Sequence, residues 1–357
     1  MAANTVLYGF MNLKDVFSDR VEDVGVGVVN TAIDATLAEH NRQMASLMGI
    51  FALPTTEYKL RWKTPVNSRL QPLDENGRAR PIRALGHYDI AFPLHDAGSA
   101  WGMTYKASQK MTVQDANNIL STMLTADRRW IRDHIMAALF TNVAWTFTDE
   151  EHGALTVKGL ANGDTDTYLV QAGADTGVTD THYLAQAAAI ADITDPFQTI
   201  YDELNEHPEN SGEIVVLIPT GLKATVEALT AFYPTTDDNL RYGTGATLLQ
   251  NPLGVALPGR LLGYHEAKVY IAEWKSMPAN YMIAVSTGGS QALAMRQEPE
   301  TQLQGFNRVA ERNDYPFFES QYLRSAGFGG YNRVGALVMR IGNGSYAIPT
   351  GYDSPMA

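Results

Sequence analysis

Apolar side chains recur at helical spacing along residues 112–142, in steps of three, four or seven. They are Val113, Ala116, Leu120, Leu124, Ile131, Ile135 and Leu139. This spacing places them on one face of a helix. Thr112 and Asp115 have the spacing of a capping box and predict where the helix begins. Charged residues from Asp127 to Asp133 interrupt the apolar stripe, so the pattern fits neither a coiled coil nor a membrane span.

Two stretches alternate with a period of two instead, which is typical of strands. Tyr58, Leu60 and Trp62 share one side of the first stretch. The second runs from His87 to Leu94, and an Asn76-Gly77 turn lies between the two. We therefore expect a long two-stranded hairpin. An isolated hairpin has little core of its own, so we expect its apolar side to be covered by a neighbouring subunit.

The remaining patterns divide the chain into five expected segments. Residues 1–54 form an N-terminal arm and a short helix from Thr31, and residues 55–100 form the hairpin. Residues 101–195 hold the long helix and an acidic, loop-rich insertion. Residues 196–300 form an α/β lobe around the apolar strand Ile214 to Ile218, and residues 301–357 return to β strands. The fold class expected is therefore α+β.

Charge changes the picture at the hairpin. The whole chain carries a formal net charge of −12, which argues against binding nucleic acid through its overall field. The hairpin is basic, with acidic residues counted only at Asp74 and Glu75. Its basic residues are Lys59, Arg61, Lys63, Arg69, Arg78, Arg80 and Arg83. We interpret them as contacts to an acidic surface of another subunit. A solvated face that prevents aggregation is one alternative, and nucleic-acid binding is a weaker one because no aromatic residues are interleaved.

Catalytic and metal-binding patterns are absent from the sequence. There is no cysteine, and none of the phosphate-loop, nucleophile-elbow, zinc-protease or dinucleotide fingerprints occurs. The eight histidines are dispersed without metal-ligand spacing, and Asp164 and Asp166 lack the spacing of a calcium loop, which favours a solvated acidic loop. We expect no catalytic, cofactor or metal site. We also expect no signal peptide and no membrane span.

The order of elements resembles a known family: arm, basic hairpin, very long helix, α/β lobe and β-rich tail. It is similar to the major capsid proteins of tailed bacteriophages, with the Hong Kong 97-type fold that encapsulin shells share. The segment GRLLGYHEAKVYIAEWKSMPANYMIAV at Gly259 to Val285 and the tail YLRSAGFGGYNRVGALVM at Tyr322 to Met339 carry the resemblance. It implies that the hairpin is the extended E-loop, the long helix the spine of the peripheral domain, and residues 196–300 the axial domain.

The resemblance implies a structural protein, not an enzyme. It would self-assemble through hexamers and pentamers into an icosahedral shell that encloses double-stranded DNA without sequence-specific binding, in a virion assembled in the host cytoplasm. A portal and separate scaffolding or decoration proteins are further partners that the resemblance allows. The short arm implies that scaffolding, if used, is a separate protein, and the lysines near the base of the hairpin do not support a covalent cross-link. An encapsulin shell and an oligomeric α/β enzyme stay open as alternatives.

Overall fold

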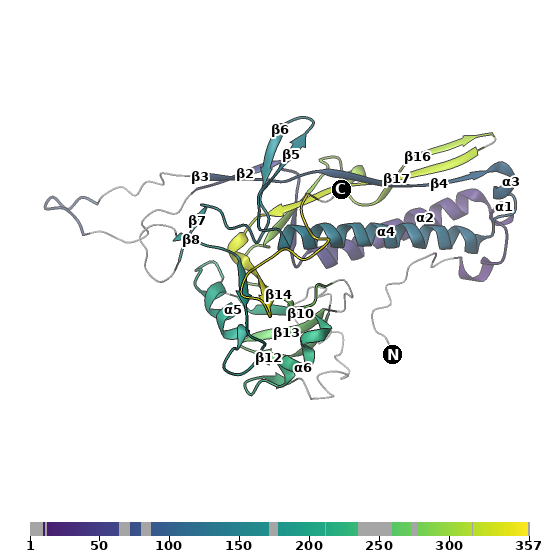
Figure 1. Ribbon diagram of the computed structural model, residues 1–357. Coiled ribbons are helices and arrows are strands. Elements are labelled where there is room, and N and C mark those ends of the chain that lie inside the picture. Colours follow the sequence, from purple (N-terminus) through teal and green to yellow (C-terminus); the bar gives the residue numbers. More distant parts are fainter. Residues whose placement is uncertain are drawn as a thin grey trace. The chain divides into compact units, whose positions relative to one another are not determined.

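The computed structural model describes residues 10, 13–63, 72–79, 87–170, 178–210, 212–234, 259–272, 277–315 and 317–355 (Figure 1). Its contacts divide the chain into two compact units. Unit 1 contains residues 1–46, 94–134 and 296–327, and unit 2 contains residues 47–93, 135–295 and 328–357. Each unit is therefore built from segments that are far apart in the sequence.

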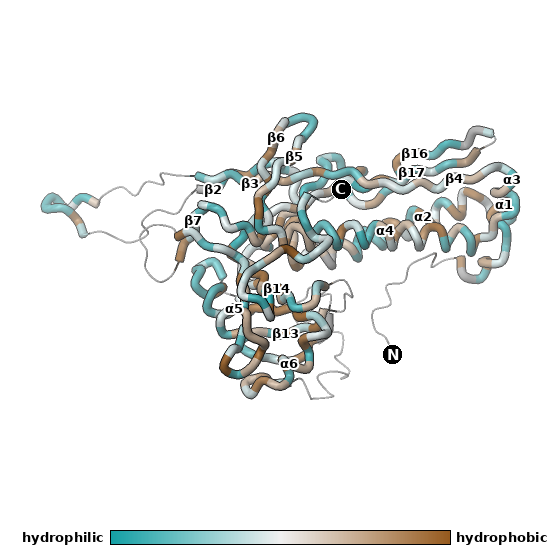
Figure 2. Tube along the Cα trace, viewed as in Figure 1, coloured by the Kyte–Doolittle hydropathy of each residue, from teal (hydrophilic) through white to brown (hydrophobic). Residues whose placement is uncertain are grey.

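Two helices form the body of unit 1. These are α2 (Val26–Met48) and α4 (Val113–Phe140), whose last residues belong to unit 2. Figure 1 shows them side by side, and Figure 2 shows hydrophobic and hydrophilic residues alternating along α4. Ile33 and Leu37 of α2 pack in one core with Leu120 and Leu124 of α4. The long amphipathic helix expected from the sequence is confirmed.

The beginning of α4 is set by the capping box. The Thr112 hydroxyl accepts a hydrogen bond from the backbone N–H of Asp115 at 3.2 Å. In return, the Asp115 carboxylate accepts from the Thr112 backbone N–H at 3.1 Å and from its hydroxyl at 2.8 Å. These hydrogen bonds satisfy donors that a helix start leaves free, and they lower the pKa of Asp115.

The helix α2 differs from the expected short helix at the N-terminus. It begins at Val26 rather than Thr31 and has 23 residues. The physical reason is that Val29 is buried at helical spacing from Ile33, so the Val-Gly repeat continues the apolar face of the helix. Gly25, at φ +100°, turns the chain between α1 (Val21–Val24) and α2. The segment belongs to the core of unit 1 and is not an arm beside it.

A three-stranded antiparallel arrangement completes unit 1. Strand β17 (Phe317–Gly330) pairs with β16 (Asn307–Asp314) on one side and with β4 (His95–Thr104) on the other. The pairing with β4 runs without a break from Phe317 opposite Thr104 to Ala326 opposite His95. Short elements also occur in this unit. They are η1 (Lys14–Val16), α3 (Tyr105–Ser108) and η3 (Thr301–Leu303).

Unit 2 contains a seven-stranded sheet in the order β11-β12-β13-β10-β14-β18-β9. Strand β10 (Ile214–Ile218) lies in its middle, parallel to β13 (Ala267–Ala272) and antiparallel to β14 (Tyr281–Ser286). Every residue of β10 is buried, as its apolar sequence predicted. The outer strands are β11 (Tyr233–Pro234), β12 (Gly259–His265), β18 (Ala336–Ile341) and β9 (Tyr183–Gln186).

Helices pack on this sheet as part of one hydrophobic core. Helix α5 (Pro196–Asn205) contributes Phe197 and Ile200, and Asp195 caps its first turn by accepting from the backbone N–H of Phe197 at 2.9 Å. The helix expected from Leu222 to Ala231 is shorter, because it divides into η2 (Thr220–Leu222) and α6 (Lys223–Glu227). Strand pairing also departs from the expected segments, since β9 and β18 join the sheet of the α/β lobe from outside residues 196–300. The domain bounds stay a prediction.

The base of the hairpin lies in a second sheet of unit 2. A four-stranded sheet has the order β2-β3-β6-β5. Its strands are β2 (Lys59–Lys63), β3 (His87–Ala91), β5 (Trp145–Asp149) and β6 (Gly153–Val157). Strands β7 (Thr167–Tyr168) and β8 (Val178–Thr179) form a separate pair, and β1 (Ala52–Thr55) pairs with β15 (Leu293–Gln297) at one end of a five-stranded sheet that continues through β17. Among the described residues, no helix combines the length and apolar character needed to cross a membrane.

Candidate functional site

The hairpin base is the first candidate, because it carries the residues singled out by charge. Strands β2 and β3 pair antiparallel from Lys59 opposite Ala91 to Lys63 opposite His87. The apolar side of this base is covered within the same chain. Ile90 and Phe92 are fully buried in a cluster with Ala294, against which Leu60 and Trp62 also pack. The expectation that a neighbour must cover the apolar side is wrong for the base, because the missing second layer comes from distant segments of unit 2.

Two of the predicted basic residues meet on one carboxylate. Asp89 accepts from Arg61 Nε at 2.9 Å and pairs with Lys59 Nζ at 2.7 Å. The hydrogen bonds from Arg61 and then Lys59 lower the pKa of Asp89. The sequence reasoning missed Asp89 as a counter-charge, although it stands in β3 opposite Arg61. Arg61 keeps most of its side chain exposed although it is paired with Asp89.

The hairpin turn is described at residues 72–79. Asp74 accepts from the backbone N–H groups of Asn76 at 2.9 Å and Arg78 at 2.7 Å, and Gly77 has φ +74°. This confirms the predicted turn, and Arg78 is exposed beside it. Arg69, Arg80, Arg83 and the side chain of Lys63 lie outside the described residues. Contact of these basic residues with a neighbouring subunit stays a prediction.

A buried ion cluster lies in the same unit, formed by Lys158, Asp164, Asp166 and Arg333. Arg333 Nη1 is 3.0 Å from Asp164 Oδ2 and 3.2 Å from Asp166 Oδ2, and Lys158 Nζ is 3.1 Å from the same Asp164 oxygen. Although burial opposes the charged form, the Arg333 charge lowers the pKa of Asp164. Burial raises the pKa of Asp166. The expectation of a solvated acidic loop is wrong. Asp164 and Asp166 are largely buried because Arg333, from the distant C-terminal part of the chain, balances their charge.

Aromatic rings connect this ion cluster to the hairpin base. Lys158 Nζ lies 5.9 Å from the centroid of the Tyr88 ring on β3. Tyr88 in turn meets Tyr168 edge to face, with centroids 6.1 Å apart. Burial raises the pKa of Tyr88 to about 12, so its hydroxyl stays neutral at physiological pH. The charges of Lys158 and Arg333 are matched by those of Asp164 and Asp166. We therefore interpret the cluster as an ion network that stabilises the fold, not as an acid or base for proton transfer.

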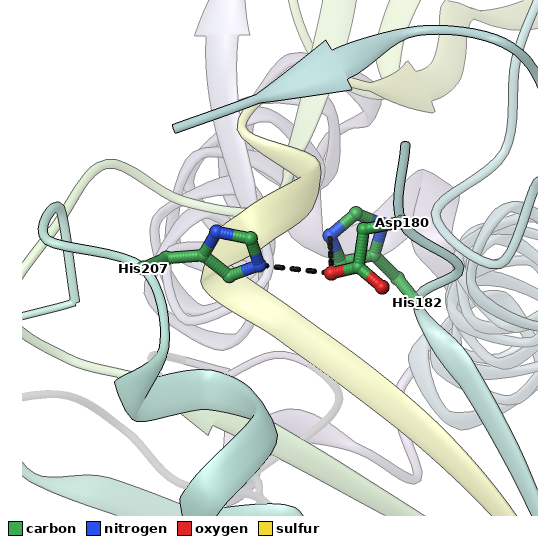
Figure 3. Close-up of side chains that lie close together, drawn as sticks. All are labelled: Asp180, His182 and His207. Atoms are coloured by element: carbon green, nitrogen blue, oxygen red, sulfur yellow. Dashed lines mark hydrogen bonds and ion pairs between the residues drawn. The ribbon is translucent and has the colours of Figure 1, made fainter. Parts of the chain in front are cut away.

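Three further titratable side chains converge beside α5 in unit 2. Asp180 follows β8, His182 precedes β9, and His207 follows α5. One ligand atom from each lies within 4.8 Å of the others, and Figure 3 shows both imidazoles directed at one carboxylate oxygen of Asp180. The interpretation of the histidines as dispersed is wrong for this pair. Their separation in sequence hides the cluster, and only the close spacing of Asp180 and His182 could have indicated it.

Protonation differs across this cluster. Burial lowers the pKa of His182 to about 3, so this ring is neutral. Burial opposes the charged form of His207 as well, but its hydrogen bond to Asp180 raises its pKa overall. Glu203 on α5 is half-buried, and burial followed by the nearby charge of Asp180 raises its pKa to about 7.

A cavity in the described part of unit 1 has a volume of about 180 Å³. It is lined mainly by apolar side chains, among them Val21, Val29, Trp101 and Met111. Its titratable side chains are Glu22, Tyr105, Glu311 and Glu319, without a histidine or lysine among them.

Solved structures that are similar to this chain include two from bacteriophages. A chain from a structure of Mycobacterium phage Patience has 18% sequence identity and a TM-score of 0.70, with 99% of each chain covered. A chain from the asymmetric unit of the bacteriophage PhiM1 mature capsid has 8% identity and a TM-score of 0.50, with 83% of this chain and 86% of that chain covered. No family model and no curated protein matches the sequence. The α+β fold is therefore the Hong Kong 97-type capsid fold that the sequence resemblance implied.

Proposed function

We propose that the chain is a major capsid protein that self-assembles into the icosahedral shell of a tailed bacteriophage around its double-stranded DNA. The observation that carries this proposal is the fold likeness over the whole chain to the Mycobacterium phage Patience structure, at a TM-score of 0.70. The likeness to a chain of the PhiM1 mature capsid supports the same assignment. The subunits would form hexamers and pentamers, and the protein would be located in the virion after assembly in the host cytoplasm.

Exposed apolar side chains support association with other copies. Tyr315 is 84% exposed at the end of the β16–β17 hairpin, and Phe317 beside it is 58% exposed. Tyr105 lies next to Tyr315, with ring centroids 5.8 Å apart, and is also exposed. Aromatic residues that remain exposed together are typical of surfaces that bind another protein. We infer that this end of unit 1 contacts a neighbouring subunit.

The net charge of −12 supports loose contact with the enclosed genome. An acidic wall makes few phosphate contacts, so DNA can enter and leave the shell without sticking. A portal and separate scaffolding or decoration proteins would complete the assembly. The protein would act by shape and packing, with no catalytic step.

Electron microscopy and light scattering of the purified full-length chain test the proposal. A capsid protein elutes as megadalton particles or as capsomers, and its particles show hexagonal lattices closed by fivefold vertices. A single small closed oligomer that forms no larger particle at any salt or protein concentration would contradict the proposal and favour an oligomeric enzyme. Regular shells that exclude DNA in infected cells would point to a compartment for protein cargo instead.

A further inference from the structure

The geometry of Asp180, His182 and His207 contains a contact that a neutral His207 imidazole cannot satisfy by itself, although an imidazolium could donate to Asp180. His207 Nδ1 lies 2.9 Å from the backbone carbonyl of Leu169, and a carbonyl can only accept, so Nδ1 carries the proton. In the neutral ring, Nε2 then presents a lone pair, yet it lies 2.9 Å from the Asp180 carboxylate Oδ2. Two acceptors face each other at this distance only when a cation or an added proton lies between them.

His182 faces the same oxygen from another direction. Its Nε2 is 3.7 Å from Asp180 Oδ2, which is too long for a hydrogen bond. The side chain is 2% exposed, and neither ring nitrogen has a hydrogen-bond partner among the described residues. An imidazole that is buried in this way without partners is costly. A bound cation would give its Nε2 lone pair a partner.

We propose that Asp180 Oδ2, His182 Nε2 and His207 Nε2 bind one divalent transition-metal ion of the zinc type. Ligand atoms of a tetrahedral zinc site, each about 2.0–2.1 Å from the metal, are about 3.3 Å from one another. The observed separations of 2.9 and 3.7 Å lie on either side of that value, and all three atoms are within 4.8 Å. Two imidazoles and one carboxylate form a ligand set that suits zinc.

The outer contacts of the cluster have the form that metal sites use. The Nδ1–H of His207 donates to the Leu169 carbonyl, which fixes the ring so that Nε2 points inward. Metal-binding histidines commonly have such an orienting hydrogen bond. Glu203 of α5 contacts Asp180 and can supply the fourth ligand, directly or through a water molecule.

The carboxyl groups beside His182 and His207 also favour a bound cation. Lys158 and Arg333 are already matched by Asp164 and Asp166. Asp180 therefore faces the two histidines, and Glu203 adds a second carboxyl group beside it. A divalent ion neutralises both carboxylates and leaves the imidazoles as neutral ligands.

The site would serve as a cross-link in a chain without cysteine. It connects the end of α5 to the segment between β8 and β9, so the metal would add a cross-link between parts of unit 2 that already pack in one hydrophobic core. Because the ligands do not converge in the unfolded chain, metal binding stabilises the folded state.

The test uses the full-length protein stripped with EDTA and dialysed against metal-free buffer at pH 7.5. Zinc should then bind at one ion per chain by mass spectrometry of the metal, and a large excess over Kd should raise Tm by about 5 °C. Cobalt should bind at the same site and give the visible absorption of a tetrahedral centre. The variants Asp180→Asn and His207→Gln should each lower zinc affinity at least about tenfold. The control His265→Gln changes another buried histidine that pairs with one carboxylate, Asp195 at 2.8 Å, and should bind zinc as the wild type does.

Three results would overturn the inference. One is the absence of zinc or cobalt binding to the stripped, folded wild-type chain at 100 µM metal. Another is full retention of the metal by both ligand variants. The third is a wild-type Tm that does not respond to zinc. In that case a proton shared between His207 Nε2 and Asp180 Oδ2, and not a metal ion, would explain their contact. The first and third outcomes are measured on the wild-type chain, so they remain decisive even if a variant fails to fold. Particle formation, observed by electron microscopy, tests the capsid proposal separately.

Discussion

Arg324 of β17 and Asp127 of α4 form a buried ion pair in the interior of unit 1. Arg324 Nη2 donates to Asp127 Oδ2 at 2.8 Å, Nε donates to Oδ1, and each side chain is 2% exposed. His40 of α2 approaches the same carboxylate, with Nε2 2.7 Å from Oδ2. One carboxylate therefore joins the two long helices to the central strand of the unit.

Removing that carboxylate should destabilise the subunit strongly. Asp127→Ala leaves the Arg324 guanidinium buried without its counter-charge, which costs about 3–5 kcal/mol. Urea unfolding of the unassembled chain should show the loss as a lower midpoint. Glu39→Gln removes an exposed carboxylate that pairs with Arg42 in the same unit and should leave the midpoint nearly unchanged. Equal midpoints for Asp127→Ala and the wild type would show that the pair does not hold the unit together.

Asp127 also shows why sequence patterns give only part of the fold. The helical period of α4 is a local property, so its apolar face and its capping box could be predicted from adjacent residues. The same pattern treats Asp127 as a polar interruption of the stripe. Its partner Arg324 is 197 residues away, and no local rule connects the two. The charge at this position is part of the core and not a break in it.

The candidate sites also divide into features that adjacent residues predict and features that depend on distant residues. The hairpin strands and their turn were predictable, because alternation and an Asn-Gly turn are short-range signals. The cover on the hairpin base was not, since Ala294 and Tyr331 come from distant segments. The convergence of His182 with His207 likewise depends on how β9 and α5 pack in unit 2, which spacing along the chain does not reveal.

Two histidines of unit 1, the buried His134 and the half-buried His95, should make its stability fall in mild acid. Burial lowers the pKa of His134, and burial together with the nearby His134 lowers that of His95, while Asp133 and Asp96 oppose these shifts. The folded state thus binds fewer protons than the unfolded state once the pH drops below about 6.5, and stability is lost from there downward.

The measurement is the urea midpoint of the unassembled chain between pH 7.5 and pH 5.0. The double variant His95→Gln, His134→Gln should show a shallower decline than the wild type, whereas His87→Gln, at an exposed position, should follow the wild-type curve. A double variant as acid-sensitive as the wild type would assign the decline to other groups.

Gly159 lies against the end of α4 in unit 2, and its lack of a side chain is required there. A Cβ at this position would lie 2.6 Å from the carbonyl oxygen of Thr141 and 3.0 Å from that of Ala138. The adjacent Leu160 N–H donates to that Ala138 carbonyl at 2.8 Å, so the backbone cannot move away without losing a hydrogen bond. Gly159→Ala should lower the free energy of unfolding by about 1–3 kcal/mol. Gly221→Ala, where a Cβ would meet nothing within 4 Å, is the matched control and should have little effect in the same urea titration.

The basic residues near the hairpin turn should be needed for closing shells but not for folding. The base of the hairpin is already covered by its own chain, and Lys59 and Arg61 are paired with Asp89, so the basic residues farther along the hairpin are the ones available to another subunit. Charge pairs at an interface set register and depend on salt more than they add affinity.

Replacing Arg78, Arg80 and Arg83 together by Glu should therefore give a chain with a normal circular dichroism spectrum and a normal Tm that no longer forms closed particles by electron microscopy. The control replaces the exposed residues Arg42, Lys110 and Arg129 of unit 1 by Glu, with the same change in net charge, and should still form shells. Intact shells from the first variant would remove the hairpin residues from assembly, and a collapsed Tm would place them in the core of the subunit instead.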